Sequence, residues 1–170
     1  SPLLPKPQQN IYATFVQVRR MAMSVYSVFA LTLMLFPTVT AQIGSTSPLA
    51  FWRDTIFVPL SFVNFNFFDF VGRMVAGLFR LQPATQDKLW LGCALRVVFI
   101  PLFLLCSTPF SREHGSDVFL SDAWPVLIMV VFATTNGLLS SLLMMYGPSR
   151  VAAQDQNVAG TIMVTCLTFG

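Results

Sequence analysis

An aspartate and an arginine lie inside an otherwise apolar stretch of the sequence, in the run NFNFFDFVGR from Asn64 to Arg73. The stretch covers residues 56–79 and consists mostly of aliphatic, aromatic and glycine residues. In a membrane helix, a charged side chain near the centre costs about 2.5–3.5 kcal/mol, so it is retained only where it is paired, hydrated or functional. These two charges are therefore the first candidates for chemistry.

Helical geometry gathers the polar residues of this run on one face. At about 100° per residue, Asn66, Asp69 and Arg73 fall within roughly 60° of arc. Phe62 continues the same face, whereas Asn64 points to the opposite side of the helix. The sequence thus predicts one polar stripe about 10 Å long.

Two interpretations of the Asp69 and Arg73 pair are open at this point. An acid four residues before a base can form an intrahelical ion pair that neutralises itself. However, a guanidinium has five donors and a carboxylate about four acceptor sites, so one contact cannot use them all. The alternative is that both line a water-filled cavity and bind a neutral solute rich in hydroxyl groups. The neighbouring phenylalanines would then supply apolar walls for a ring.

Composition identifies the medium. Of the 170 residues, 55% are hydrophobic and only 10% are charged, whereas a typical soluble domain has about 25% charged residues. The surplus apolar surface must face lipid, and the net charge of +3 is no evidence for binding to nucleic acid. Lipid cannot satisfy an open strand edge, and the apolar segments lack the alternation of a barrel. An all-α integral membrane protein is predicted.

The apolar segments predict four full membrane spans and a fifth that is cut off, because a spanning helix needs about 20 residues. The chain starts without a methionine and stops within the last segment, so we expect a piece of a longer protein. The predicted order is a cytoplasmic segment 1–20, a span 21–43, an extracellular loop 44–55, a span 56–79, a cytoplasmic loop 80–88, a span 89–106, an extracellular loop 107–122, a span 123–147, a cytoplasmic loop 148–156 and the truncated span 157–170.

The basic residues predict the orientation, since short cytoplasmic loops hold the excess of Lys and Arg. Arg53 and Arg112 are the basic residues of one set of alternate loops. The other set, which includes the N-terminal end, contains Lys6, Arg19, Arg20, Arg80, Lys88 and Arg150. The N-terminal end is therefore predicted to be cytoplasmic.

Other residues within the spans suggest packing and helix breaks. Pro37 removes a backbone donor, so it should kink the first span or end its regular part, with Phe36 beside the same cavity; Pro101 should act likewise in the third span. Arg96 is interpreted as a structural anchor to a neighbouring carbonyl or acid. The fourth span contains small and hydroxyl residues that let helices approach and hydrogen-bond: Thr134, Thr135, Asn136, Gly137, Ser140 and Ser141.

No pattern for catalysis, a cofactor or a metal is found, so an enzyme is not expected. Cys93, Cys106 and Cys166 are odd in number and lie within predicted spans, where small packing residues are the expected role.

Several motifs, in order, resemble the equilibrative nucleoside transporter family over nearly the whole chain. FNFFDFVGR is similar to the Asn-x-x-Asp-x-x-Gly-Arg signature of the family's eighth helix, and LFPTVT to a motif of the seventh. FWRDTIFVPLSF resembles the approach to the eighth helix, LRVVFIPLFLLC the ninth, DAW and TNGLLSSLLMMYGP the tenth, and AGTIM the start of the eleventh. The family pattern in the tenth helix has a tyrosine where this chain has Leu138, which puts a role for that hydroxyl in doubt.

The resemblance implies the C-terminal helical bundle of a major-facilitator-like transporter, whose six-helix N-terminal half is missing here. It implies facilitative nucleoside transport by alternating access, with Asp69 and Arg73 engaging the ribose and Asn66, Phe62 and Phe36 lining the site. The plasma membrane is expected, with an organellar membrane as the alternative. A carrier of another polyol such as a hexose, and a helical receptor or assembly subunit that does not transport, are the competing functions.

Overall fold

The computed structural model describes residues 10–106 and 121–170, and every regular element within these ranges is a helix. Three helical stretches are long and apolar enough to cross a membrane: Ile11–Gln42, Trp52–Ala76 and Ala123–Arg150. The chain is thus an all-α membrane protein, as its composition predicted. The predicted cytoplasmic residues 1–9 and residues 107–120 of the predicted extracellular loop lie outside the described residues.

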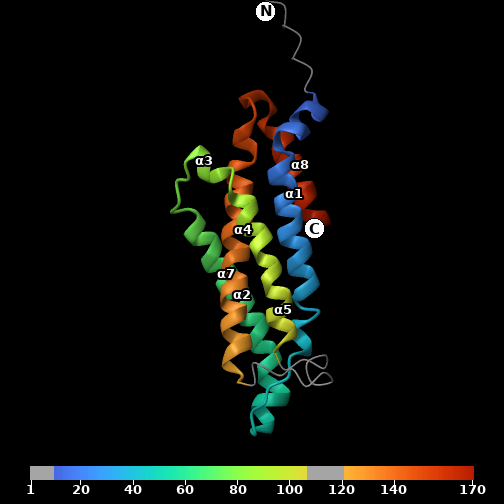
Figure 1. The fold of residues 1–170 in the computed structure, drawn as a ribbon, viewed down its shortest axis with the longest axis vertical. Coiled ribbons are helices and arrows are strands. Elements are labelled where there is room, and N and C mark those ends of the chain that lie inside the picture. Colours follow the sequence, from blue (N-terminus) through green and yellow to red (C-terminus); the bar gives the residue numbers. More distant parts are fainter. Residues whose placement is uncertain (1–9, 107–120) are drawn as a thin grey trace, which may run out of the picture.

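The long helices run side by side along one axis, with α8 against α1 and α2 against α7 (Figure 1). The elements are α1 Ile11–Leu35, η1 Thr40–Gln42, the π-helix η2 Trp52–Ile56, α2 Phe57–Ala76, α3 Pro83–Gln86, α4 Leu89–Leu95, η3 Arg96–Val98, α5 Phe99–Leu104, α7 Ala123–Tyr146, η4 Pro148–Arg150, η5 Ala153–Asp155 and α8 Gln156–Phe169.

Helix α1 is displaced toward the N-terminus relative to the predicted span 21–43. It begins at Ile11 because the Asn10 side chain accepts a hydrogen bond from the Ala13 N–H, at 3.1 Å, and caps the first turn. It ends at Leu35, since a residue that precedes proline is disfavoured in the helical region, and Phe36 is extended with φ −122° and ψ 124°. The prediction that Pro37 ends the regular helix is confirmed.

The predicted span 89–106 is not one continuous α-helix. A 3-10 turn, η3, separates α4 from α5. Pro101 has no N–H to donate to the carbonyl of Val97, so the regular i to i−4 ladder is interrupted here. Arg96 is the first residue of this irregular turn.

Helices α2 and α7 approach each other through a reciprocal pair of glycines. A Cβ on Gly137 would collide with the carbonyl oxygen of Asp69, and a Cβ on Gly72 with that of Thr134. The same added atoms would lie 2.9 Å from the backbone nitrogens of Arg73 and Leu138, respectively. Only residues without a side chain allow two helix backbones to come this close, which is a common device in membrane bundles.

The apolar core has two main parts with a polar layer between them. One cluster contains Val28, Ala76, Cys93 and Leu139, and the other contains Leu35, Phe65, Phe103, Phe132 and Ala133. Each of four helical elements has one polar residue that lies, along the sequence, between a residue of the first cluster and a residue of the second. These residues are Thr32 in α1, Asp69 in α2, Arg96 in η3 and Asn136 in α7.

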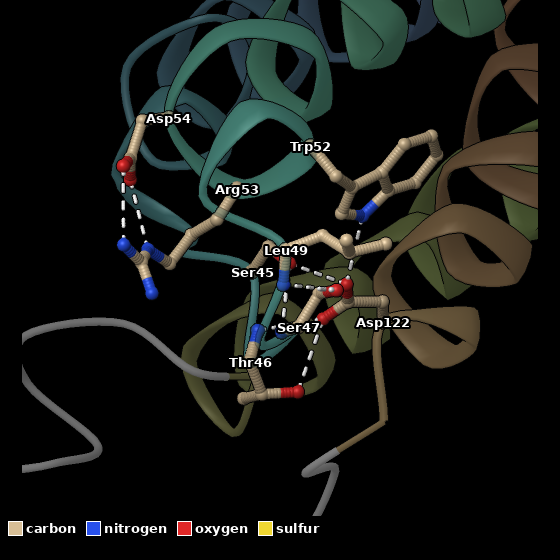
Figure 2. A network of polar contacts seen from close by, with 8 residues as sticks. All are labelled: Ser45, Thr46, Ser47, Leu49, Trp52, Arg53, Asp54 and Asp122. Atoms are coloured by element: carbon tan, nitrogen blue, oxygen red, sulfur yellow. Dashed lines mark hydrogen bonds and ion pairs between the residues drawn. The ribbon is translucent and has the colours of Figure 1, made fainter.

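One end of the bundle, predicted to be extracellular, is held by Asp122 at the start of α7 (Figure 2). Its carboxylate accepts hydrogen bonds from the Ser45 hydroxyl, from the Thr46 N–H at 2.8 Å and from the Trp52 indole N–H at 3.1 Å. Partial burial raises the pKa of Asp122, but these hydrogen bonds outweigh it, so the pKa lies below its ordinary value of 3.8. Asp122 therefore ties the connection before α2 to α7 as an anion.

The other end is joined by Tyr146 and Arg150. The Tyr146 hydroxyl donates to the Phe79 carbonyl at 3.1 Å and accepts from the Leu81 N–H at 3.0 Å. Arg150 forms an ion pair with Asp87 at 2.7 Å. Both contacts connect the end of α7 to the segment that follows α2.

Candidate functional site

The candidate site is the polar layer, in which four helical elements place side chains against one another. Asp69 and Arg73 come from α2, Asn136 from α7, Arg96 from η3 and Thr32 from α1. Arg96, Asn136 and Thr32 are buried, whereas Arg73 is exposed at the side of the bundle. The layer thus extends from the interior of the bundle to one open face.

The predicted pair of Asp69 and Arg73 is present. Arg73 Nε donates to Asp69 Oδ2 at 2.8 Å, with the i, i+4 spacing that the sequence indicated. The Arg73 side chain is 46% exposed and that of Asp69 only 15%. Within the described part of the chain, Arg73 hydrogen-bonds through Nε alone, so both Nη groups stay available on the open side.

Asp69 has a second partner that spacing along the sequence did not reveal. Asn136 Nδ2 donates to Asp69 Oδ1 at 2.7 Å, so each carboxylate oxygen has its own donor. This contact joins α2 to α7 one residue before the close approach at Gly137. Asn136 was expected among the residues that let helices approach and hydrogen-bond, but its partner was not predicted.

Arg96 lies at the closed end of the layer. Its guanidinium donates to the Phe132 carbonyl at 2.9 Å, to Thr135 Oγ1 at 2.8 Å and to Thr32 Oγ1 at 2.9 Å. The Cζ atom of Arg96 lies 4.5 Å from the centroid of the Phe132 ring, which is a cation–π contact. The expected anchoring of Arg96 to a neighbouring carbonyl is confirmed.

Aromatic rings cover the layer toward the Asp122 end. The Phe36 ring stacks on Phe65 at 4.1 Å between centroids and tilts against Phe62 at 4.9 Å. The structure therefore brings Phe36 and Phe62 together, one from the end of α1 and the other from α2. Both rings are half-buried and can present an apolar wall.

The two asparagines of α2 point in different directions, as helical spacing predicted. Asn66 is exposed, and its Nδ2 donates back to the Phe62 carbonyl of its own helix at 2.8 Å. Asn64 instead donates to the Val126 carbonyl of α7 at 3.2 Å. Asn66 shares the face of Asp69 but is not hydrogen-bonded to it in the described structure.

The cysteines lie in apolar surroundings. Cys93 and Cys106 are buried and Cys166 is half-buried, and all three are free thiols. Their positions agree with a packing role, and Cys106 donates weakly to the Leu102 carbonyl of its own helical turn at 3.3 Å.

The fold and the site define a helical membrane protein with an ionic polar cluster open at one face of the bundle. A family model described as Nucleoside transporter matches residues 5–170. The chain belongs to the equilibrative nucleoside transporter family.

Curated relatives agree with this assignment. The chain is 38% identical to equilibrative nucleoside transporter 1 of Rattus norvegicus and 36% identical to that of Homo sapiens, over 95% of its length in each case. It is 32% identical to equilibrative nucleoside transporter 2 of Homo sapiens, also over 95% of its length. It spans only 35–36% of the length of these relatives.

Proposed function

We propose that the whole protein is a facilitative transporter of nucleosides, not an enzyme, and that this chain is its C-terminal half. The observation that carries the proposal is the Asp69–Arg73 pair. Its two inner contacts fix the carboxylate, while the Nη groups of Arg73 stay on the open face. Donors without acceptors are costly in apolar surroundings, so the Nη groups need acceptors that the described residues do not supply, and a hydroxyl-rich solute can supply them.

The chemistry of the site suits a ribose. A carboxylate can accept from vicinal hydroxyls, and a guanidinium fork can donate to hydroxyl and ring oxygens. The rings of Phe36 and Phe62 would pack on the apolar parts of the same solute. We assign Asp69 and Arg73 to ribose binding, and Asn66, Phe62 and Phe36 to the lining of the pocket.

We infer that transport proceeds by alternating access between this major-facilitator-like bundle and the N-terminal half of the whole protein. Transport down a gradient needs only a site that faces each side in turn and binds with modest affinity. We place the protein in the plasma membrane. The distribution of Lys and Arg supports an orientation with the N-terminal end of this chain in the cytoplasm.

The test is uptake of radiolabelled uridine or adenosine by the full-length protein, with Asp69→Asn beside wild type. The substitution keeps the shape of the side chain but removes the charge that holds Arg73. Loss of a hydrogen bond between charged groups costs about 1.5–3 kcal/mol, which is about 10- to 150-fold in affinity. The matched control is Asp54→Asn, because Asp54 forms a similar pair with Arg53 but both side chains are exposed, at 60% and 45%.

Unchanged uptake by Asp69→Asn at equal surface abundance would remove Asp69 from the site. Competition by a hexose, but not by a nucleoside, would show a carrier for another polyol.

The exchange of Asp69→Arg with Arg73→Asp separates binding from packing. A receptor or assembly subunit that needs only the pair would keep its abundance and its function, whereas a ribose site would lose transport.

A further inference from the structure

Arg96 is a buried cation without an acidic partner among the residues that the structure describes. Its side chain is 1% exposed, and the ion pairs of the described residues do not include it. Its Nε has no hydrogen-bond partner there. Burying an unpaired guanidinium between helices is expensive, and anchoring to a carbonyl does not by itself require a charge. The arrangement of its neighbours offers a second reason for the charge.

The carboxamide of Asn136 lies between this cation and the carboxylate of Asp69. Its Oδ1 lies 3.4 Å from Arg96 Nη2 and 2.7 Å from Thr32 Oγ1, while its Nδ2 lies 2.7 Å from Asp69 Oδ1. The opposite orientation would place the amide N–H groups against a guanidinium and the amide oxygen against a carboxylate. Only the first orientation satisfies all four groups.

Arg96 is the constant donor in this arrangement. The Thr32 hydroxyl has one hydrogen but two acceptors at 2.7 Å, the Val28 carbonyl and Asn136 Oδ1. When that hydrogen goes to Val28, Arg96 is the one donor to the amide oxygen that remains within residues 10–106 and 121–170. Arg96 also donates to Thr32 Oγ1, which fixes this hydroxyl in turn.

We propose that Arg96 is a positioning residue for the Asp69 carboxylate, acting through Asn136. The cation orients the amide, the amide donates to Oδ1, and Oδ2 is left to Arg73. The carboxylate is thereby held in one rotation without covering the open side of Arg73. The consequence for nucleoside binding rests on the proposed function, but the contacts and their coupling do not.

The test replaces Asn136 with aspartate in the full-length protein. The carboxylate that Asn136→Asp introduces can accept from Arg96 but cannot donate to Asp69, and two carboxylates at hydrogen-bond distance cannot both stay ionised at low cost. Uridine uptake by Asn136→Asp should therefore be low near neutral pH and should recover as the pH falls, when protonation restores a donor. Asn136→Ala, which cannot titrate, should be low without recovery.

The role of Arg96 is tested by adding Arg96→Gln to Asn136→Asp. In the described part of the chain, the charged or titratable groups next to Asn136 or Arg96 are Asp69 and Arg73 of α2 and Cys93 of α4, and they are the same in both variants. Loss of the cation disfavours the ionised acid, so the pH at the midpoint of recovery should rise by about 1–3 units. An equal midpoint in the two variants, or full activity of Asn136→Asp near neutral pH, would overturn the proposal.

Two further measurements keep the test decisive. The first is the thermal unfolding temperature of the purified full-length variants, measured as a function of pH. The pH at which this temperature changes should be higher by the same 1–3 units, roughly, in the double variant than in Asn136→Asp, even if no nucleoside is transported. Absence of uptake by wild type would refute the proposed function alone. If Arg96→Gln does not accumulate, Arg96→Met, which fills space without a charge, replaces it in the wild-type background. A raised KM at unchanged kcat is then expected, and an unchanged KM would overturn the proposal.

Discussion

Substitution of Gly137 by alanine should damage the candidate site without touching any of its side chains. A methyl group at this position would collide with the carbonyl oxygen of Asp69 and would lie 2.9 Å from the backbone nitrogen of Arg73. Neither atom can rotate away, because both belong to the backbone of α2. The two helices must separate until ordinary contact distances of about 3.5–4 Å are restored to the Asp69 oxygen as well, a shift of about 1.5–2 Å.

This shift is large relative to the hydrogen bond beside it. The contact from Asn136 Nδ2 to Asp69 Oδ1 is 2.7 Å long, so an added distance of about 1.5–2 Å would break it. Overpacking typically costs 1–3 kcal/mol of stability. A lost hydrogen bond to a charged group costs about 1.5–3 kcal/mol, and we expect the apparent KM for uridine to rise by about tenfold or more.

The assay is concentration-dependent uridine uptake by the full-length protein, normalised to its abundance at the membrane. The matched control is Gly160→Ala, because a Cβ on Gly160 meets no atom within 4 Å in the described residues. Gly137→Ala with the KM of wild type at equal abundance would show that the close approach of α2 and α7 does not set the geometry of Asp69.

Two further predictions concern the ends of the bundle. Asp122→Asn should lower the thermal unfolding midpoint of the full-length protein near neutral pH. Because the pKa of Asp122 is depressed on folding, the stability that its carboxylate contributes is present above the ordinary pKa and is lost as the pH falls through the lower folded pKa. The difference in midpoint between variant and wild type should therefore shrink in acid, and a difference independent of pH would contradict this. Tyr146→Phe removes the donor to the Phe79 carbonyl and the acceptor for the Leu81 N–H; a loss of about 1 kcal/mol in unfolding free energy is expected, and an unchanged chemical-denaturation midpoint would show that this contact contributes nothing.

Contacts within one helix could be predicted from the sequence. The spacing of Asp69 and Arg73 fixes their separation in any regular helix, so helical geometry made the ion pair one of the two interpretations of this run. The opposite directions of Asn64 and Asn66 followed for the same reason. The all-α class required only composition, since lipid excludes open strand edges.

Contacts between helices were not predictable in the same way. The pairing of Asn136 with Asp69 depends on the register of α7 against α2, which the backbone approach at Gly72 and Gly137 determines. The start of α1 at Ile11 was not predicted, because the span 21–43 was taken from hydropathy, which marks where a chain leaves lipid and not where its helix begins. The cap at Asn10 and the polar residues Arg19 and Arg20 belong to the same continuous helix as the apolar run.

The direct backbone contact of α2 and α7 also limits how this helical bundle can change shape. Helices that meet through interleaved side chains can slide or roll, because rotamers adjust as the surfaces move past each other. Helices that meet at two glycines contact each other through backbone carbonyl groups, which cannot change rotamer to allow such movement. The two helices must therefore move as one rigid body. Any conformational cycle has to take place at other helix interfaces of the molecule.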